Sequence, residues 1–370
     1  MNRRKFLAST LATTAVSVLS RSVLAQTPVT KPPVSIGTVR IGVDIYSLQS
    51  QNFTPFQSLD YCSKLGVNVV HFSEIRFLGS LDPANLLKVK DYAAKRNIDL
   101  EIGMRSICPS STMFDPSQGS AEEQLGKMIQ AAKIIGSPIV RCVLGSSNER
   151  SGKIPLEGHI ENTIQVLKNV RSQAIDAQIK IAIENHAGDM QARELKSLVE
   201  GAGKDFVGVC IDSGNPMWTL ESPHLTLETL YPYVLTSHVR DTYVWMTDSG
   251  AAVQWCRTGE GNIGIDSYIK RYIELCPGRA LSAEVIVLPQ PRIFAVRDPN
   301  FWGPYKNTPA WEYERFIELA EKGTAPARWV PQPPSQHVQA IPEQKAQQLA
   351  TQREDLEASI KYTKELVARL

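Results

Sequence analysis

The sequence predicts an α/β fold, namely a (β/α)8 TIM barrel with a long insertion after strand eight and a C-terminal helix. Two observations carry this prediction. Strand-like and helix-like segments alternate over eight units of the 370-residue chain, as folds built around a parallel sheet require. Four successive strand-like segments also each end in one acidic or imidazole side chain, which is typical of barrels that gather catalytic residues at the carboxyl ends of their strands.

The four polar strand ends lie in the second half of the chain. The segments 180–184, 206–212, 235–238 and 280–284 end on Glu184, Asp212, His238 and Glu284. Side chains alternate between the two faces of a strand, so each of these residues shares a face with small residues, such as Ala182 or Cys210. The opposite faces carry large aliphatic residues. We therefore expect the small and polar residues to face the barrel interior and the aliphatic residues to face the outer helices.

The first four strand–helix units are predicted from apolar runs and from signals at helix ends. Strands are expected at 39–48, 67–75, 100–104 and 139–144, and helices at 55–65, 83–96, 120–135 and 156–177. Pro83 follows the N-cap candidate Asp82, and Ser120 opens a Ser-Ala-Glu-Glu pattern that is typical of a capping box. Gly66 and Gly136 stand where glycine commonly ends a helix.

The second half continues the alternation, with helices expected at 191–201, 225–233 and 266–276. Residues 288–341 are then predicted to be an insertion rich in Pro, Arg and aromatic residues, with a helix at 311–322. A long loop at the catalytic face usually acts as a lid or a binding loop, and the alternative is a stabilising or partner-facing excursion. The helix expected at 342–370 has an apolar stripe and is interpreted as the eighth barrel helix.

The N-terminus predicts export. Arg3 and Arg4 begin a twin-arginine pattern, and the moderately apolar segment that follows is too short to span a bilayer. We predict a twin-arginine signal peptide over residues 1–25, cut after Ala25, then a flexible lead-in over 26–38 and a barrel domain over 39–370. The folded protein would be exported to the periplasm or another extracytoplasmic space, with an uncleaved tether as the alternative.

Charge and cysteine content exclude some classes of function. Residues 1–25 contain four basic residues and no acidic one, so their removal changes the formal net charge from +2 to about −2. This balance favours neither nucleic acid nor an anionic membrane surface as a partner, and no stable membrane insertion is expected. None of the six cysteines forms a C-x-x-C pair, which argues against a thiolate zinc site. A homo-oligomer is compatible with the composition.

The four strand-end residues predict a metal site. Three carboxylates and one imidazole suit one divalent ion, with Mn²⁺ favoured and Mg²⁺, Co²⁺ or Zn²⁺ possible. Such an ion would polarise a carbonyl group and stabilise an enediolate. One carboxylate at a strand end is weak evidence, because it often forms only an ion pair or a helix cap. Four such residues in succession make the metal site the stronger interpretation.

These segments resemble the xylose isomerase-like barrel superfamily, specifically its sugar phosphate isomerase/epimerase branch. The resemblance spans about residues 39–287 and the last helix. Its motifs are Glu184-Asn-His186, Asp212-Ser-Gly-Asn215, His238-Val-Arg-Asp241, Gly259-Glu-Gly-Asn-Ile-Gly264 and Ser282-Ala-Glu284. The resemblance implies that Glu184 and Glu284 bind the metal and act as catalytic acid/base groups, while Asp212 and His238 complete the metal shell. The motifs are specific for the superfamily but not for a substrate.

Two departures from family patterns narrow the function. Many ketose epimerases of the family have a histidine where this chain has Asn215, which puts a ketose substrate in doubt. The Gly259 to Gly264 loop is also similar to the DNA-repair endonuclease branch, which needs further His and Asp ligands for three zinc ions. The end of the fourth strand, at residues 144–148, has no histidine, and no Asp-x-His precedes Gly259. A repair endonuclease is therefore disfavoured.

Further polar residues near strand ends are candidates for contact with substrate. They are Glu74, Arg105, Arg141, His186, Asn215, Asp241 and Arg257. Each can equally be a structural group or can orient a metal ligand, and His186 and Asp241 fit that second role best.

The leading hypothesis is a metal-dependent isomerase or epimerase that abstracts a proton next to a carbonyl group of an unphosphorylated carbohydrate. The first alternative is a metal-dependent lyase or hydrolase that cleaves 3-keto-glycosides by β-elimination after the same first step. The second alternative is a sugar-binding protein without catalysis. The sequence does not decide among them.

Overall fold

The computed structural model describes residues 39–327 and 342–370. The predicted signal peptide (1–25), the lead-in (26–38) and the last part of the predicted insertion (328–341) lie outside the described residues. Among those described, no helix combines the length and the apolar character needed to cross a membrane. All six cysteines are buried, and no disulfide joins any two of them.

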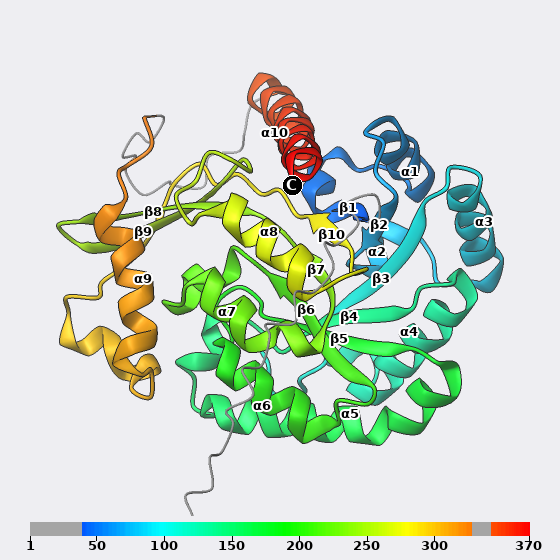
Figure 1. Ribbon diagram of the computed structural model, residues 1–370. Helices are drawn as coiled ribbons and strands as arrows, with labels where there is room; N and C mark the ends of the chain where they lie inside the picture. Colours follow the sequence, from blue (N-terminus) through cyan, green and yellow to red (C-terminus); the bar gives the residue numbers. More distant parts are fainter. Residues whose placement is uncertain (1–38, 328–341) are drawn as a thin grey trace, which may run out of the picture. The chain divides into compact units, whose positions relative to one another are not determined.

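Eight parallel strands form the barrel, in the order β10-β1-β2-β3-β4-β5-β6-β7. Their bounds are β1 (Ile41–Asp44), β2 (Val69–Phe72), β3 (Asp99–Ser106), β4 (Ile139–Val143), β5 (Lys180–Glu184), β6 (Val207–Asp212), β7 (Val234–His238) and β10 (Leu281–Ala283). A parallel bridge from Val239 to Ala283 joins β7 to β10 and closes the circle. The predicted TIM barrel is thereby confirmed, and Figure 1 shows the strands surrounded by helices.

The helices follow the predicted alternation. Their bounds are α1 (Pro55–Lys64), α2 (Ile75–Leu78), α3 (Pro83–Ala94), α4 (Ala121–Ile135), α5 (Leu156–Ala177), α6 (Ala192–Ala202), α7 (Pro223–Leu230), α8 (Ile265–Leu275), α9 (Ala310–Lys322) and α10 (Pro342–Arg369). Ser120 caps α4 with the predicted capping box, and Gly136 ends it in the left-handed conformation. Leu356 and Ile360 on α10 are buried, and α10 packs beside β10 at the seam of the barrel.

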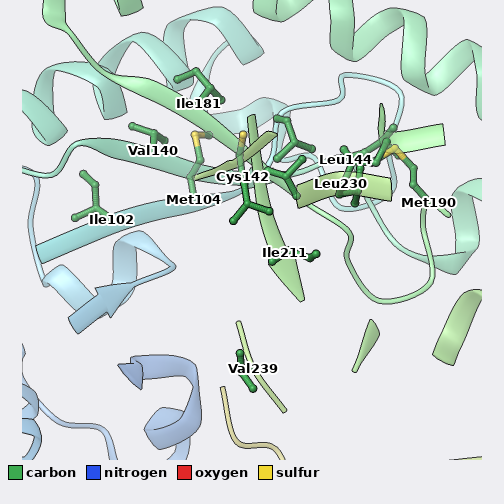
Figure 2. Close-up of a cluster of buried hydrophobic side chains, with 14 of the residues drawn as sticks. Ile102, Met104, Val140, Cys142, Leu144, Ile181, Met190, Ile211, Leu230 and Val239 are labelled. Atoms are coloured by element: carbon green, nitrogen blue, oxygen red, sulfur yellow. The ribbon is translucent and has the colours of Figure 1, made fainter. Parts of the chain in front are cut away.

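The apolar core lies between the strands and the helices. Figure 2 shows part of it, where Ile102, Val140, Ile181 and Ile211 come from four neighbouring strands. Residues next to these along the same strands pack in a different cluster. Ile139, Ala182 and Cys210 form a separate small buried cluster with Leu235. This separation agrees with the predicted alternation, since Ala182 and Cys210 lie in a different cluster from the neighbouring aliphatic residues Ile181 and Ile211.

The first strand is shorter than predicted. The sequence analysis expected a strand over 39–48, but β1 ends at Asp44, and a 3-10 helix, η2 (Ile45–Gln51), follows. The Asp44 carboxylate accepts a hydrogen bond of 2.8 Å from the Tyr46 N–H, which turns the chain out of the strand. Asp44 consequently stands at the carboxyl end of β1, beside the other strand ends.

A second sheet, which the sequence analysis did not predict, lies outside the barrel. The antiparallel strands β8 (Asp241–Thr247) and β9 (Gly250–Cys256) form a hairpin, and β11 (Arg292–Phe294) pairs with β9. The hairpin leaves the barrel after β7, and the described part of the predicted insertion adds the third strand, β11, to it. Helix α9 packs on β8, so the insertion is folded onto this sheet (Figure 1).

The remaining elements are short 3-10 helices between strands and helices. They are η3 (Pro116–Gln118), η4 (Ser147–Arg150), η5 (Asn215–Thr219), η6 (Tyr231–Tyr233) and η7 (Pro299–Tyr305). Two of them, η4 and η5, directly follow the carboxyl-terminal ends of β4 and β6. They therefore help to form the rim of the barrel mouth.

Candidate metal centre

Four buried ligand candidates converge at the carboxyl ends of neighbouring strands. Glu184, Asp212 and His238 are the last residues of β5, β6 and β7, and Glu284 follows β10 directly. One ligand atom of each residue lies within 4.8 Å of the ligand atoms of the other three. The parallel register pairs Asp212 with His238, whereas Glu184 pairs with Cys210, two residues before the end of β6. The fold therefore brings together all four residues of the predicted metal site.

His238 lies at the middle of this cluster. Its Nδ1 is 3.0 Å from Glu184 Oε2 and 3.3 Å from Glu284 Oε2, yet it has no partner with hydrogen-bond geometry. Its Nε2 hydrogen bonds to His71 Nδ1 at 2.9 Å and lies 3.0 Å from Asp44 Oδ2. A carboxylate can only accept, so Asp44 favours a hydrogen on Nε2, and the two glutamates beside Nδ1 favour either a hydrogen or a bound cation there.

Two buried arginines form ion pairs with the carboxylates and offset part of their negative charge. Arg141 Nε donates to Glu184 Oε2 at 2.5 Å, and Arg240 Nη2 donates to Asp212 Oδ2 at 2.6 Å and also to Glu284 Oε2. Burial alone would raise the pKa of Glu184, but the charge of Arg141 and the smaller contributions of His238 and His186 together outweigh it and hold this pKa well below the ordinary value. For Asp212, burial prevails over the charge of Arg240 and raises the pKa.

Backbone and amide groups orient the Asp212 and Glu184 carboxylates. Asp212 Oδ1 accepts hydrogen bonds of 2.7 Å from the N–H groups of Gly214 and Asn215. The Asn215 side chain donates to Glu184 Oε1 at 3.2 Å. The amide of Asn185 hydrogen bonds to the backbone of Asp212 in both directions and ties the end of β5 to the end of β6. These contacts hold the two carboxylates in fixed directions without using all of their oxygen lone pairs.

The donor set fits a divalent cation. Three carboxylates and one imidazole match the preference of Mn²⁺, Mg²⁺ or Co²⁺ for oxygen-rich sites and also admit Zn²⁺. The partnerless Nδ1 of His238, with carboxylate oxygens beside it, is the atom whose bonding a cation would complete. Two further triads, Asp44/His71/His238 and Glu184/Cys210/His238, share this histidine. The four-residue set is favoured over them because Glu284 borders an open cavity.

That cavity has a volume of about 260 Å³. Its lining includes Glu74, Arg105, Arg141, His186, Asn215, Trp218, Arg240, Trp255 and Glu284. Trp218 and Trp255 stack with their ring centres 4.3 Å apart, and the Arg240 guanidinium lies 4.2 Å from the centre of the Trp255 ring. The cavity thus joins one candidate metal ligand to aromatic faces and hydrogen-bonding groups, which is a combination suited to a polyhydroxylated ligand.

Comparison with known proteins identifies the family. The family model described as xylose isomerase-like TIM barrel matches residues 59–287, which is more than half of the chain. The chain belongs to the xylose isomerase-like TIM barrel family. Among curated proteins, a 3-oxo-isoapionate decarboxylase from Pectobacterium atrosepticum is 22% identical over 216 residues, which cover 56% of this chain and 69% of that protein.

Solved structures of this family share the fold. The D-psicose 3-epimerase of Clostridium cellulolyticum H10, solved with D-tagatose, aligns with a TM-score of 0.54 and 12% identity over 76% of this chain and 96% of its own. The 3-keto-D-glucoside 4-epimerase YcjR of Escherichia coli aligns with a TM-score of 0.52 and 10% identity over 76% and 98%. At these identities the alignments support the barrel alone.

Five of the seven predicted substrate-contact residues line the cavity of this family member. They are Glu74, Arg105, Arg141, His186 and Asn215. Arg141 and Asn215 also contact Glu184, so they lie between the cavity and that carboxylate. His186 Nδ1 donates to the Gly145 carbonyl at 2.7 Å, and burial lowers the pKa of His186 to about 4, which leaves its ring neutral near pH 7.

Asp241 and Arg257 do not border the cavity. Asp241 begins β8, which leaves the barrel, and its Oδ2 accepts hydrogen bonds from the N–H groups of Gly259 and Gly261. Burial raises the pKa of Asp241 to about 6. Arg257 Nε donates to Asp355 Oδ1 on α10 at 2.5 Å. These contacts tie Asp241 to the glycine-rich loop and Arg257 to the last helix.

The sequence analysis missed Asp44, His71, Arg240 and Trp255 as site residues. The alternation of side chains along a strand could have predicted Arg240, because Arg240 follows His238 by two positions and extends toward the same rim. Asp44 was hidden by a predicted first strand that ran to residue 48. His71 lies in the middle of an apolar strand, and Trp255 comes from a hairpin that was not predicted.

Proposed function

We propose that the protein is a metal-dependent enzyme that removes a proton next to a carbonyl group of an unphosphorylated carbohydrate and returns a proton elsewhere, as an isomerase or epimerase. One observation carries this proposal. Glu184 and Glu284 come from strands separated by β6 and β7, yet both carboxylates lie within 3.3 Å of His238 Nδ1. Two carboxylates that approach one centre from different strands suit proton removal and proton return at different positions.

In this proposal Glu184, Asp212, His238 and Glu284 hold one divalent ion, with Mn²⁺ favoured. When bound, the ion supplies a Lewis acid that polarises the carbonyl group and stabilises the negative charge of an enediolate. The Arg240 side chain contacts both Asp212 and Glu284, so it holds these carboxylates in place and offsets part of their negative charge.

The two glutamates have unequal access to substrate. Glu284 borders the cavity directly, whereas Glu184 is reached past Arg141 and Asn215. Glu284 is thus the group placed to exchange a proton with a carbon atom in the cavity as it stands. Glu184 serves from the opposite side of the centre once substrate displaces the Asn215 amide from its Oε1.

The family supports the substrate class. The similar solved structures include epimerases of D-psicose, of L-ribulose and of a 3-keto-D-glucoside. These epimerases share carbohydrate chemistry at a carbon next to a carbonyl group. The predicted twin-arginine signal adds the proposal that the folded enzyme works in the periplasm.

A deuterium-exchange experiment tests the proposal. The purified protein is stripped of metal, reloaded in separate samples with Mn²⁺, Mg²⁺, Co²⁺ or Zn²⁺, and incubated in heavy water with a panel of aldoses, ketoses and 3-keto-sugars. We expect deuterium at a carbon next to the carbonyl group and an isomerised or epimerised product, both dependent on the metal. Absence of exchange and of product with every sugar and with each of the four metals would reject the proposal.

A second candidate function is β-elimination from a 3-keto-glycoside by a lyase or hydrolase. Two observations favour it: Asn215 stands where many ketose epimerases have histidine, and the relatives include proteins named for a 3-oxo-sugar acid and a 3-keto-glucoside. The first step is the same, but only this reaction releases a free aglycone. Release of an aglycone from 3-keto-glycosides selects this candidate, whereas tight binding without deuterium uptake selects a sugar-binding role.

A further inference from the structure

The cavity beside the metal centre continues into a second, larger cavity. This outer chamber has a volume of about 480 Å³. It shares Tyr46, Glu74, Arg105 and Met113 with the inner cavity, so these four residues form the junction between the two. None of the four candidate metal ligands lines the outer chamber. Any group bound there would be attached to the reacting part of a substrate but would not itself react.

The outer chamber is polar but has no excess of formal charge. Its charged lining residues are Glu74, Arg76, Arg105 and Asp115. Glu74 and Arg76 form an ion pair of 2.5 Å. Hydrogen bonds from Ser117, together with the nearby charge of Arg105, hold the pKa of Asp115 below its ordinary value. Two acidic and two basic groups balance, so the chamber does not favour a phosphate group or a polyanion.

The remaining walls offer neutral hydrogen-bonding groups and apolar faces. Gln118 is the last residue of η3, Gln124 lies near the start of α4, and Ile75 is the first residue of α2. Met113 and the Tyr46 ring lie at the junction, and the Arg76 guanidinium is 5.6 Å from the centre of that ring. A glycosyl unit has hydroxyl groups at its edge and C–H groups on its faces, so it complements this mixture.

Arg105 is the polar group best placed at the junction. Its side chain has no hydrogen bond or ion pair within the part of the chain that the structure describes, although Arg105 lines both cavities. Its guanidinium carries five N–H donors in a planar fork. These donors are available to the oxygen atoms of a linkage that passes from one cavity to the other.

We propose that the substrate is a glycoside with two units, whose carbonyl-bearing ring lies at the metal centre and whose second, uncharged glycosyl unit lies in the outer chamber. This inference rests on the proposed function and names the substrate class of the same site. The glycosidic linkage passes between Tyr46, Glu74, Arg105 and Met113. A monosaccharide occupies only the inner cavity and makes no contacts with the outer chamber.

The test compares 3-ketocellobiose, whose oxidised ring is a 3-ketoglucosyl unit, with 3-ketoglucose on the metal-loaded, full-length protein. Calorimetry gives the two dissociation constants, and deuterium uptake from heavy water gives the two rates. We expect the disaccharide to bind at least about tenfold more tightly, which corresponds to roughly 1.4 kcal/mol. Equal or weaker binding of the disaccharide would overturn the two-unit substrate.

Variants of the outer chamber test whether it causes the tighter binding of the disaccharide. Gln118→Trp places bulk in the outer chamber from an exposed position, and Ile75→Trp does so from the opposite wall. Each should lower the ratio of disaccharide to monosaccharide affinity about tenfold. Gln165→Trp, at an exposed position on α5 outside both cavities, is the matched control and should keep the ratio. A ratio that survives both chamber variants would show that the second unit binds elsewhere.

The two readouts separate the two proposals. If 3-ketoglucose takes up deuterium with metal but the disaccharide binds no better, the enzyme function stands and the two-unit substrate fails. If the disaccharide binds more tightly but neither sugar takes up deuterium, the outer chamber stands as a binding site and the proton-transfer function fails.

Discussion

Two layers of the same barrel interior differ in chemistry although both are buried. In the barrel interior, β5 and β6 each carry a small residue and, two residues toward the carboxyl end, a carboxylate: Ala182 and Glu184 on β5, and Cys210 and Asp212 on β6. We call the small residues the first layer and the carboxylates the second. All four side chains have no exposed surface. The first layer is small and apolar, whereas the second holds carboxylates, arginines and a histidine. Burial therefore does not mark the site, and the chemistry within the buried interior does.

The polar layer also contains atoms whose bonding is incomplete. His238 Nδ1, His71 Nε2, Arg240 Nε and Asn215 Oδ1 are all buried without a hydrogen-bond partner. Leaving a buried polar group unsatisfied costs about 1–3 kcal/mol. A protein selected only for stability would replace such a cluster with apolar residues. The polar layer is thus explained by function, and the apolar layer beneath it by packing. The following changes test that division.

The largest effect is expected from replacing the proposed acid/base groups. Glu184→Gln and Glu284→Gln should each lower turnover by roughly a hundredfold or more, which is the usual scale for loss of a general base. The amide keeps the size of the side chain and one oxygen that can bind a metal, but it cannot accept the proton. Turnover and metal content are measured on the same samples. Near-normal turnover with metal retained in both variants would rule out the two-carboxylate mechanism.

A smaller effect on turnover is expected at Asp212, which has no proposed proton to move. Asp212→Asn should weaken metal binding by about tenfold or more, since loss of metal-site partners costs affinity on that scale. Turnover should recover when metal is added in excess. Equilibrium dialysis followed by metal analysis gives the affinity. A variant that binds metal normally but stays inactive at saturating metal would instead place Asp212 in the chemical step.

Substitutions in the apolar layer should change the stability of the fold rather than the activity. Ala182→Leu adds volume to the small cluster with Ile139 and Cys210 and should destabilise the fold by about 1–3 kcal/mol, as overpacking usually does. Ala94→Leu, at an exposed position on α3, is the control and should change stability by no more than about 0.5 kcal/mol. Chemical denaturation measures both. Equal stabilities of the two variants would contradict a tightly packed lower layer.

The smallest effect concerns a buried acid away from the site. Burial raises the pKa of Glu221 to about 7, against a usual value of 4.5. A folded-state pKa above the unfolded value stabilises the fold at low pH, and this stabilisation is lost as pH rises toward and through 7. The wild type should therefore lose about 1 kcal/mol more than Glu221→Gln between pH 6 and pH 7. Parallel pH profiles of the two proteins would show that Glu221 does not titrate in this range.

The comparison of the two layers also shows which features of the fold and of the candidate site can be predicted from the sequence. Strand alternation places Ala182 beneath Glu184 and Cys210 beneath Asp212, so the fold, the interior face and the four-residue cluster follow from local patterns. Arg240 and His71 do not follow, because their roles depend on which strands become neighbours around the closed barrel. The hairpin β8–β9 was missed because the sequence analysis treated the chain after His238 as a connection to the next helix.

The central claim is that the polar layer is a metal centre, and metal content tests it most directly. The wild-type protein and His238→Asn are stripped, incubated with Mn²⁺, freed of excess metal and analysed for metal per chain. The replacement of His238 removes the partnerless Nδ1 around which the carboxylates gather. We expect about one ion per chain in the wild type and almost none in the folded variant. A wild type that retains no divalent ion, or a variant that retains as much as the wild type, would contradict the account.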